Sequence, residues 1–448
     1  MNRAERRQLA KSRNPRDLAA LAERQHQNGR LDRAEQNYRE AIARDPQLFE
    51  AHNNLGMILQ ERGRIAEAAA QFTRAHELRP ADARIVLNLA RALSAQNRHR
   101  DAALLFRHAV SLDPRMAEAH FGLGLAHSDL AEYAEAEQHL LRTLQIDPFN
   151  WQARIHLGLA LAAQGKIAEA YTQADVLARA ETAPGFPHKS FGILLARIGC
   201  PDGARACFES HHLRHPDDAD EIAMLLAAVG GAMPARASDG QLAQIYAARA
   251  EQWDLGAAGS RGYQGHRLVA DALDEVGIAR AGTVIDLGCG TGLVGELLRT
   301  RADRLIGVDL SEPMLAQARQ KNVYDELHQA DLLAFLERRG EGCDVIASAA
   351  TLIHFGELDA IFQAAAKHLR PTGRFAFTLF PNDDDADAVG VASLHGLGQS
   401  GCFRHGSGYV TQAAARHGLR VELMRRAAHE HVNGSPIEGL VVVLRLAA

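Results

Sequence analysis

The chain has 448 residues, of which 47% are hydrophobic and 23% are charged, so we expect two or three globular domains. Its net charge of −5 gives no general attraction to nucleic acid, and no stretch approaches the roughly eighteen uninterrupted apolar residues of a membrane span. We therefore expect neither nucleic acid nor a membrane as a partner. The five cysteines, an odd number without C-x-x-C spacing, predict no disulfide framework, no metal site and a reducing, cytoplasmic compartment.

After a basic N-terminal tail over residues 1–13, the chain repeats itself. Four prolines lie 34 residues apart, and a small residue follows a leucine in the first half of each block, as at Gly56 and Gly124. An alanine recurs in the second half, often with an aromatic residue four positions later, as at Ala68 and Phe72. The prolines are Pro46, Pro80, Pro114 and Pro148. This pattern resembles the tetratricopeptide repeat (TPR) family, whose period is about 34 residues.

The resemblance implies an all-α solenoid of stacked helix pairs over residues 14–230, with about six repeats and a capping helix. Small residues allow close helix approach, and each proline ends the second helix of its repeat because its ring cannot continue one. Residues 231–240 are rich in Gly, Ala, Pro and Ser and read as a linker.

Residues 241–448 lack the 34-residue period and have a different pattern. Short apolar runs alternate with helical patterns, which predicts a parallel sheet covered on both faces. The last two predicted strands have no helix between them, so we expect an antiparallel hairpin at one edge. The predicted strands are 283–287, 304–310, 326–331, 343–350, 373–380, 419–424 and 440–446.

The first predicted strand runs into the glycine-rich segment "DLGCGTGLVG", residues 286–295. Gly290, Gly292 and Gly295 fit the dinucleotide pattern G-x-G-x-x-G, whereas Gly288, Gly290 and Gly292 fit G-x-G-x-G. Both patterns use glycine so that the backbone can turn sharply and approach a ligand at a helix start. The glycines alone leave a nicotinamide dinucleotide and S-adenosylmethionine (SAM) open.

The neighbouring segments resemble one family. "VIDLGCGTG", "GVDLSEPMLAQAR", "HQADLLAFL" and "CDVIASAATLIHFGELD" resemble successive motifs of the class I SAM-dependent methyltransferases. Together with the repeats, the chain resembles bacterial TPR-linked methyltransferases. The resemblance implies a two-domain protein: a TPR solenoid followed by an α/β, Rossmann-like, seven-stranded methyltransferase domain with a terminal antiparallel hairpin.

The resemblance also implies a cofactor site. Gly288, Cys289, Gly290 and Gly292 would pass the methionyl part of SAM, with Asp286 oriented toward its amino group. Asp309 would accept the ribose hydroxyls, Leu310 would pack on the adenine, and Asp331 and Leu332 would hydrogen-bond it. Met314 is a further expected cofactor contact. Tyr263, in "GYQGHRLV" and close to the glycine turn in sequence, is a further expected cofactor contact. The alternatives are a helix N-cap for Asp309, a strand-end turn for Asp331 and, for Cys289, a nucleophile, although this position of the loop is commonly small or Cys.

Three residues are candidates for catalysis. His354 follows the fourth predicted strand, at the sheet edge where such folds bind ligands, and is either a base, a substrate contact or a loop histidine bound to backbone. His405 and Tyr409 resemble a short His/Tyr segment of TPR-linked methyltransferases. We expect no metal.

The resemblance implies transfer of a methyl group to a nucleophilic atom of a peptide, a protein or a small metabolite that the TPR domain recruits or encloses, with S-adenosylhomocysteine (SAH) as product. The TPR array is also a candidate site for a protein partner or for a homodimer contact. The alternative is a TPR scaffold whose second domain senses SAM without catalysis.

Overall fold

The computed structural model describes residues 14–250, 253–254, 262–391, 402–432 and 435–447. The chain divides into two compact units, Met1–Gly199 and Cys200–Ala448. The last helices of the predicted repeat array, α13 (Pro201–Arg214) and α14 (Ala219–Ala228), cluster with the second unit. No helix of the described part of the chain is both long and apolar enough to cross a membrane.

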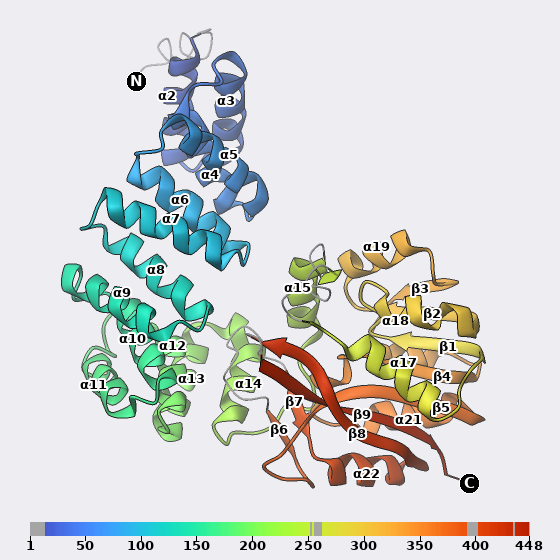
Figure 1. Cartoon of the computed structure of the whole chain (residues 1–448). Helices are drawn as coiled ribbons and strands as arrows, with labels where there is room; N and C mark the ends of the chain where they lie inside the picture. The colour runs from blue at the N-terminus through green and yellow to red at the C-terminus, as the bar shows by residue number, and fades with distance from the viewer. Residues whose placement is uncertain (1–13, 251–252, 255–261, 392–401, 433–434, 448) are drawn as a thin grey trace. The chain divides into compact units, whose positions relative to one another are not determined.

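The first unit is a series of antiparallel helix pairs, shown from blue to green in Figure 1. The helices are α2 (Pro15–Gln27), α3 (Leu31–Arg44), α4 (Phe49–Glu61), α5 (Ile65–Leu78), α6 (Ala83–Ala95), α7 (His99–Leu112), α8 (Ala117–Asp129), α9 (Tyr133–Ile146), α10 (Trp151–Ala163), α11 (Ile167–Ala178) and α12 (His188–Arg197). The sequence period therefore corresponds to one helix pair, which confirms the expected all-α solenoid.

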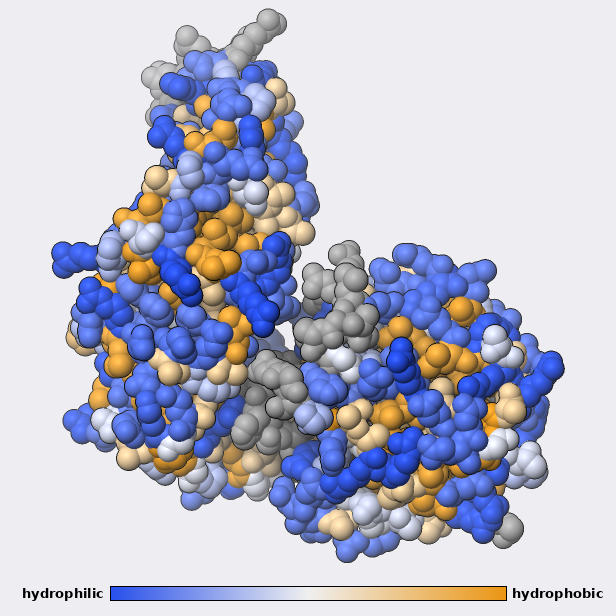
Figure 2. Space-filling model, in the orientation of Figure 1, coloured by the Kyte–Doolittle hydropathy of each residue, from blue (hydrophilic) through white to orange (hydrophobic). Residues whose placement is uncertain are grey.

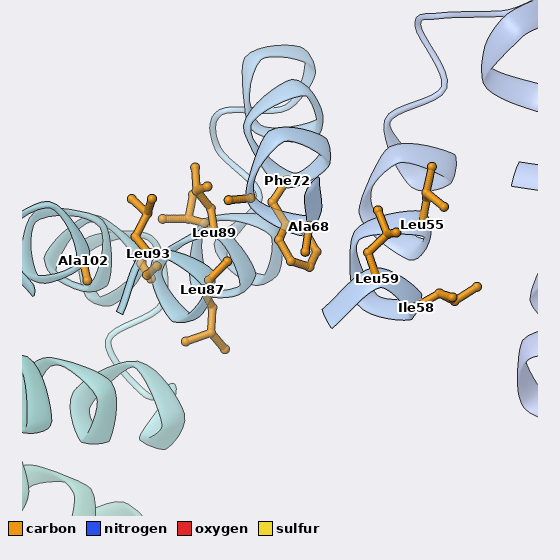
Figure 3. Packing of buried hydrophobic residues seen from close by; sticks show 14 of the residues in the cluster. Leu55, Ile58, Leu59, Ala68, Phe72, Leu87, Leu89, Leu93 and Ala102 are labelled. Carbon is orange, nitrogen blue, oxygen red and sulfur yellow. The ribbon is translucent and has the colours of Figure 1, made fainter. Parts of the chain in front are cut away.

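Glycine and aromatic residues form the contact within each pair. A Cβ placed on Gly56 of α4 would lie 2.6 Å from the ring of Phe72 on α5, so the absence of a side chain lets the two helices approach. Phe72 is fully buried, and Figure 3 shows it between leucines of α4 and leucines of α6. One ring therefore fills the gap both within its repeat and toward the next.

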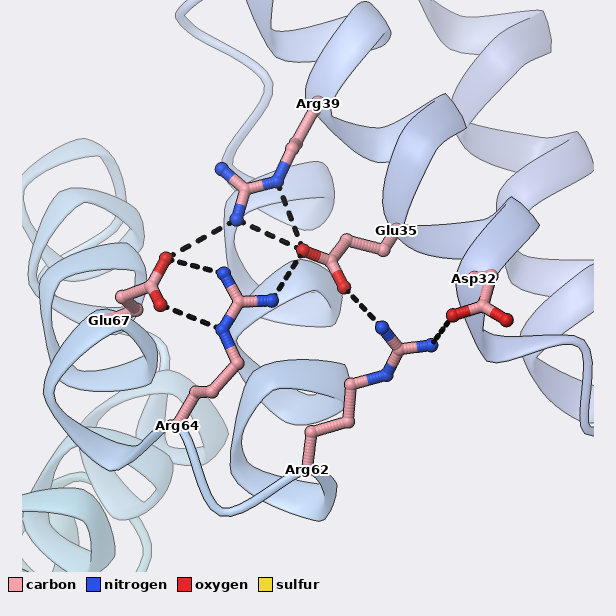
Figure 4. Close-up of polar contacts among 6 residues, drawn as sticks. All are labelled: Asp32, Glu35, Arg39, Arg62, Arg64 and Glu67. Carbon is pink, nitrogen blue, oxygen red and sulfur yellow. Dashed lines mark hydrogen bonds and ion pairs between the residues drawn. The ribbon is translucent and has the colours of Figure 1, made fainter. Parts of the chain in front are cut away.

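Ion pairs link successive repeats at the surface (Figure 4). Glu35 of α3 accepts hydrogen bonds from Arg39 and, at 2.8 Å each, from Arg62 and Arg64 after α4. Burial opposes ionisation of Glu35, but Arg64 and Arg39 outweigh it and lower the pKa of the carboxyl group. The same relation recurs three periods later, where Lys166 lies 2.7 Å from Glu137.

Apolar side chains also reach the surface of the repeat unit. Figure 2 shows hydrophobic residues gathered among hydrophilic ones on the viewed face, over the region of α6 to α8. On α7, Leu104 keeps 62% of its surface exposed. Such a residue contributes little to the fold, because it buries little apolar area.

The second unit contains one mixed sheet in the order β3-β2-β1-β4-β5-β9-β8. Strands β1 to β5 run parallel, and β9 pairs antiparallel with β5 and with β8, which confirms the predicted edge hairpin. The strands are β1 (Ala281–Leu287), β2 (Ala302–Asp309), β3 (Glu326–Gln329), β4 (Cys343–Ser348), β5 (Leu369–Pro381), β8 (Leu419–Val432) and β9 (Ser435–Leu446).

Two short strands that we do not predict extend the end of β5. These are β7 (Phe403–His405), which pairs parallel with β5, and β6 (Val389–Val391), which pairs antiparallel with β7. Each has three residues, too few to show an alternating apolar pattern in the sequence.

Helices cover both faces of the sheet (Figure 1). Along β1, Val284 packs with α17 and α18 on one face, and its neighbour Ile285 packs with α20, α21 and α22 on the other. This alternation follows from the two-residue period of a strand. The helices of this unit are α13, α14, α15 (Asp239–Arg249), α17 (Gly265–Glu275), α18 (Leu293–Leu298), α19 (Glu312–Lys321), α20 (Leu332–Arg338), α21 (Asp359–His368) and α22 (Ser407–Arg416).

Candidate active site

The glycine-rich turn between β1 and α18 has a backbone that favours glycine. Gly288, Gly290 and Gly292 have φ angles of +73°, +54° and +93°. A Cβ on Gly288 would overlap the side chain of Thr351, whereas a Cβ on Gly290 would point into open space. The turn is therefore held from behind by Thr351 and leaves room in front for a ligand.

Asp309, the last residue of β2, is hydrogen-bonded to this turn. Its carboxylate accepts from the backbone N–H of Gly290 at 2.9 Å and of Ser311 at 2.8 Å. Burial raises the pKa of Asp309, although these bonds favour the charged form. The acid and the glycine turn thus form one constellation at the carboxyl ends of β1 and β2, where open α/β sheets bind ligands.

Asp286 lies beneath the turn. Tyr324 donates its hydroxyl to Asp286 Oδ2 at 2.6 Å, while Oδ1 has no hydrogen-bond partner within the described residues. Burial raises the pKa of Asp286 to about 7, and the bond from Tyr324 opposes this effect. A Cβ on Gly295 would overlap the Tyr324 ring, so Gly295 makes room for this tyrosine. The unpartnered oxygen and the open space at Gly290 fit a ligand with hydrogen-bond donors.

A cavity of about 920 Å³, open solvent at its mouth included, lies over the turn. The cavity brings together ten of the predicted site residues: Tyr263, Gly288, Cys289, Gly290, Asp309, Leu310, Met314, Asp331, Leu332 and His354. Four others do not line it: Asp286, Gly292, His405 and Tyr409.

Both carboxylate oxygens of Asp331 have partners in the protein. Oδ1 caps α20 by accepting from the N–H of Ala334 at 2.9 Å, and Oδ2 lies 2.7 Å from Arg236 Nη1. Arg236 comes from the stretch that we predict as a linker. Its neighbour Ala237 donates its N–H to the carbonyl of His354 at 2.9 Å. Residues 231–240 thus contribute to the wall of the cavity.

His354 lies in a short 3₁₀ helix after β4 and faces the same cavity as the glycine turn. Its Nε2 is 2.8 Å from the hydroxyl of Tyr246 on α15, and the two rings meet nearly edge-to-face, at 78°. The imidazole is buried. Its contact with Tyr246, from a distant part of the chain, holds it in one orientation.

His405 and Tyr409 bind the loop that follows His354. The fully buried His405 donates Nε2–H to the carbonyl of Phe355 at 2.7 Å, and Tyr409 accepts from the N–H of Leu358 at 3.0 Å. Burial lowers the pKa of His405 to about 4, so the imidazole is neutral at physiological pH. Both residues bind the backbone segment that follows His354.

The surroundings of Cys289 do not favour a nucleophile. Burial raises the pKa of the Cys289 thiol well above its usual range, which disfavours the thiolate that a nucleophile requires. No group of three His, Cys, Asp or Glu side chains in the described ranges has an arrangement that could hold a metal ion.

Tyr324, Thr351 and Arg236 are three residues of this site that are not among the predicted ones. They contact Asp286, Gly288 and Asp331 from 38, 63 and 95 residues away. Of these three contacts, only that of Tyr324 has a trace in the sequence. Gly295, the last glycine of the pattern G-x-G-x-x-G, indicates that another group approaches the backbone closely there.

The strand order, the glycine turn after β1 and the acid that ends β2 together define a class I methyltransferase fold. Residues 284–373 match the family model described as a methyltransferase domain. Residues 19–83, 87–150 and 127–184 match a tetratricopeptide repeat model. The chain therefore carries N-terminal TPR repeats and a C-terminal class I methyltransferase domain.

Curated relatives resemble the second part of the chain. A trans-aconitate 2-methyltransferase of Paracidovorax citrulli is 33% identical over 118 residues, which are 26% of this chain and 45% of that protein. A ubiquinone biosynthesis O-methyltransferase of Idiomarina loihiensis is 31% identical over 121 residues, 26% of this chain and 49% of that protein. The chain thus spans about half the length of these relatives.

Solved structures resemble each part separately. A crystal structure of MamA protein aligns with 39% of this chain and 95% of its own, at 21% identity and a TM-score of 0.36. The magnesium protoporphyrin IX methyltransferase of Synechocystis PCC 6803, solved with SAH, aligns with 47% of this chain and all of its own, at 16% identity and a TM-score of 0.37.

Proposed function

We propose that the protein is a SAM-dependent methyltransferase. The observation that carries this proposal is the constellation of Gly288, Gly290 and Asp309, in which an open glycine turn and a partly buried acid share one cavity. The match of residues 284–373 to a methyltransferase domain supports it.

Each part of SAM has a candidate partner in the cavity. Asp309 would hold the ribose hydroxyls, with Leu310 and Met314 against the adenine and the Leu332 N–H on its ring. Asp331, already bonded to Arg236, would reach the adenine amine with its remaining acceptor capacity. Tyr263 would close the methionyl end, with Asp286 beneath the turn serving its amino group.

SAM supplies a methyl group already activated by its positive sulfur. The protein must then align the nucleophile and exclude water. We assign His354 the role of base or substrate contact, because it lines the cavity and Tyr246 orients it. His405 and Tyr409 would act through the loop that they bind, as positioning residues.

The repeat unit would bind the substrate protein, a partner protein or a second copy of the chain. Stacked helix pairs expose extended surfaces of this kind. The names of the curated relatives differ in acceptor, and we propose a peptide, a protein side chain or a small metabolite as the class of acceptor.

The test has two stages with the full chain. Calorimetric titration should show binding of SAM and SAH and no binding of NAD. Radiolabelled methyl transfer to panels of carboxylic acids, phenols, amines and peptides should then identify the acceptor. Binding of NAD instead of SAM would refute the proposal, and SAM binding without transfer to any acceptor would favour the non-catalytic sensor.

A further inference from the structure

Three aromatic side chains line one wall of the cavity: Tyr246, Trp253 and Tyr263. The rings of Tyr246 and Trp253 are 5.6 Å apart and inclined at 64°, and those of Trp253 and Tyr263 are 6.0 Å apart and inclined at 60°. Each ring is thus steeply inclined to its neighbour in the lining of the cavity.

Neighbouring contacts hold this wall in place. His266 stacks on Tyr263 with 5.4 Å between ring centroids and 28° between the planes. Asp254, next to Trp253, accepts from Thr291 Oγ1 at 2.5 Å and lies 2.8 Å from Lys321 Nζ. Because Thr291 belongs to the glycine turn, this contact ties Trp253 to the turn.

The wall lies in the same cavity as the glycine turn and Asp309. The rings therefore lie beside the stretch that runs from the glycine turn to Asp309. On the proposed function, this stretch holds the junction of the ribose and the methionyl chain, where the sulfur lies.

Aromatic faces attract cations through the negative charge of the ring face, and tryptophan does so best. The sulfur is positive in SAM and neutral in SAH. We propose that Tyr246, Trp253 and Tyr263 form a cation-binding corner that recognises the sulfonium and so distinguishes SAM from SAH. This inference rests on the proposed function. It implies that the affinity of the site for the cofactor falls once the methyl group has been transferred.

The test compares two ligands in two variants of the full chain. Trp253→Leu removes one aromatic face, whereas Trp253→Phe keeps it. By calorimetry, Trp253→Leu should weaken SAM binding by about 3- to 30-fold more than SAH binding. Trp253→Phe should retain most of the wild-type preference.

Equal weakening of SAM and SAH in Trp253→Leu would overturn the inference, because it would assign only packing to the ring. Circular dichroism and thermal melting verify that each variant folds, and Tyr246→Leu repeats the comparison at a second ring if Trp253→Leu does not fold. Loss of the proposed function has a different signature: wild-type protein would then bind neither SAM nor SAH.

Discussion

The two units place their close contacts at very different distances along the chain. In the repeat unit, Gly56 accommodates Phe72 from the next helix, and Gly124 accommodates Leu140 in the same way two periods later. In the methyltransferase domain, Gly288 meets Thr351 from 63 residues away, and nothing repeats that contact. Damage to a repeat should therefore be local and graded, whereas damage to the glycine turn should remove the whole site.

Phe72→Ala tests whether damage to a repeat stays local, and it should have the largest effect on stability. Removing the buried ring should destabilise the repeat unit by about 3–5 kcal/mol, because a cavity remains between helices. Urea unfolding and hydrogen exchange should report the loss in helices α4 to α6, with SAM binding unchanged. Leu104→Ala is the control, since that exposed side chain should cost under about 0.5 kcal/mol. Loss of SAM binding in Phe72→Ala would show that the two units are coupled.

Gly288→Ala tests whether damage to the glycine turn removes the cofactor site. A side chain at this positive φ costs roughly 1–2 kcal/mol, and overlap with Thr351 adds to the strain. SAM affinity should fall about 100-fold, while the unfolding of the repeat unit stays unchanged. Gly340→Ala is a matched control, because nothing lies near its Cβ position and its φ is not in the left-handed range. Wild-type affinity in Gly288→Ala would mean that the turn does not carry the cofactor.

Asp309→Ala should weaken SAM binding by about 1–3 kcal/mol, through loss of charge-assisted hydrogen bonds to the ribose. Asp303→Ala, at the exposed start of the same strand, should leave affinity unchanged. Titration calorimetry measures both. Equal affinities of the two variants would remove Asp309 from the site.

Equivalent side-chain pairs in three repeats differ in whether they can titrate. At one repeat position, a side chain of the first helix bonds a residue of the second helix and the carbonyl of the preceding proline. The pairs are His52–Gln71 at 2.8 Å, His120–His139 at 3.2 Å and Arg154–Gln173 at 3.0 Å. Only the middle pair has two titratable partners.

His139→Gln should change how stability depends on pH. Burial lowers the pKa of His139 to about 4, and the nearby charges of His120, His127 and Arg107 add to this shift. An unfolded histidine titrates near 6.5, so the unfolded chain binds more protons between about pH 6.5 and 4, and stability falls as pH falls. The full shift corresponds to about 2 kcal/mol at pH 5, and solvent screening of this half-buried ring reduces it. Relative to wild type, His139→Gln should therefore gain roughly 1 kcal/mol between pH 7.5 and 5 in urea unfolding. A constant difference between the two proteins would contradict this.

How far the motifs predicted the structure depends on the distance over which each contact acts. The helix pairs, the parallel strands and the terminal hairpin follow from patterns within tens of residues, and the structure confirms them. The short strands β6 and β7 and the contribution of residues 231–240 to the cavity wall are absent from any such pattern. Arg236 meets Asp331 only because the sheet brings residue 331 to that edge.

The sequence by itself determined the period of the repeats, the glycine turn and the acid that follows the next strand, because local backbone geometry dictates those residue types. Only the tertiary structure decided that Tyr324 occupies the space at Gly295, that Tyr246 orients His354, and that His405 supports the loop instead of lining the cavity. These contacts join segments far apart in the chain, and their partners are chosen by packing, which leaves no periodic trace in the sequence.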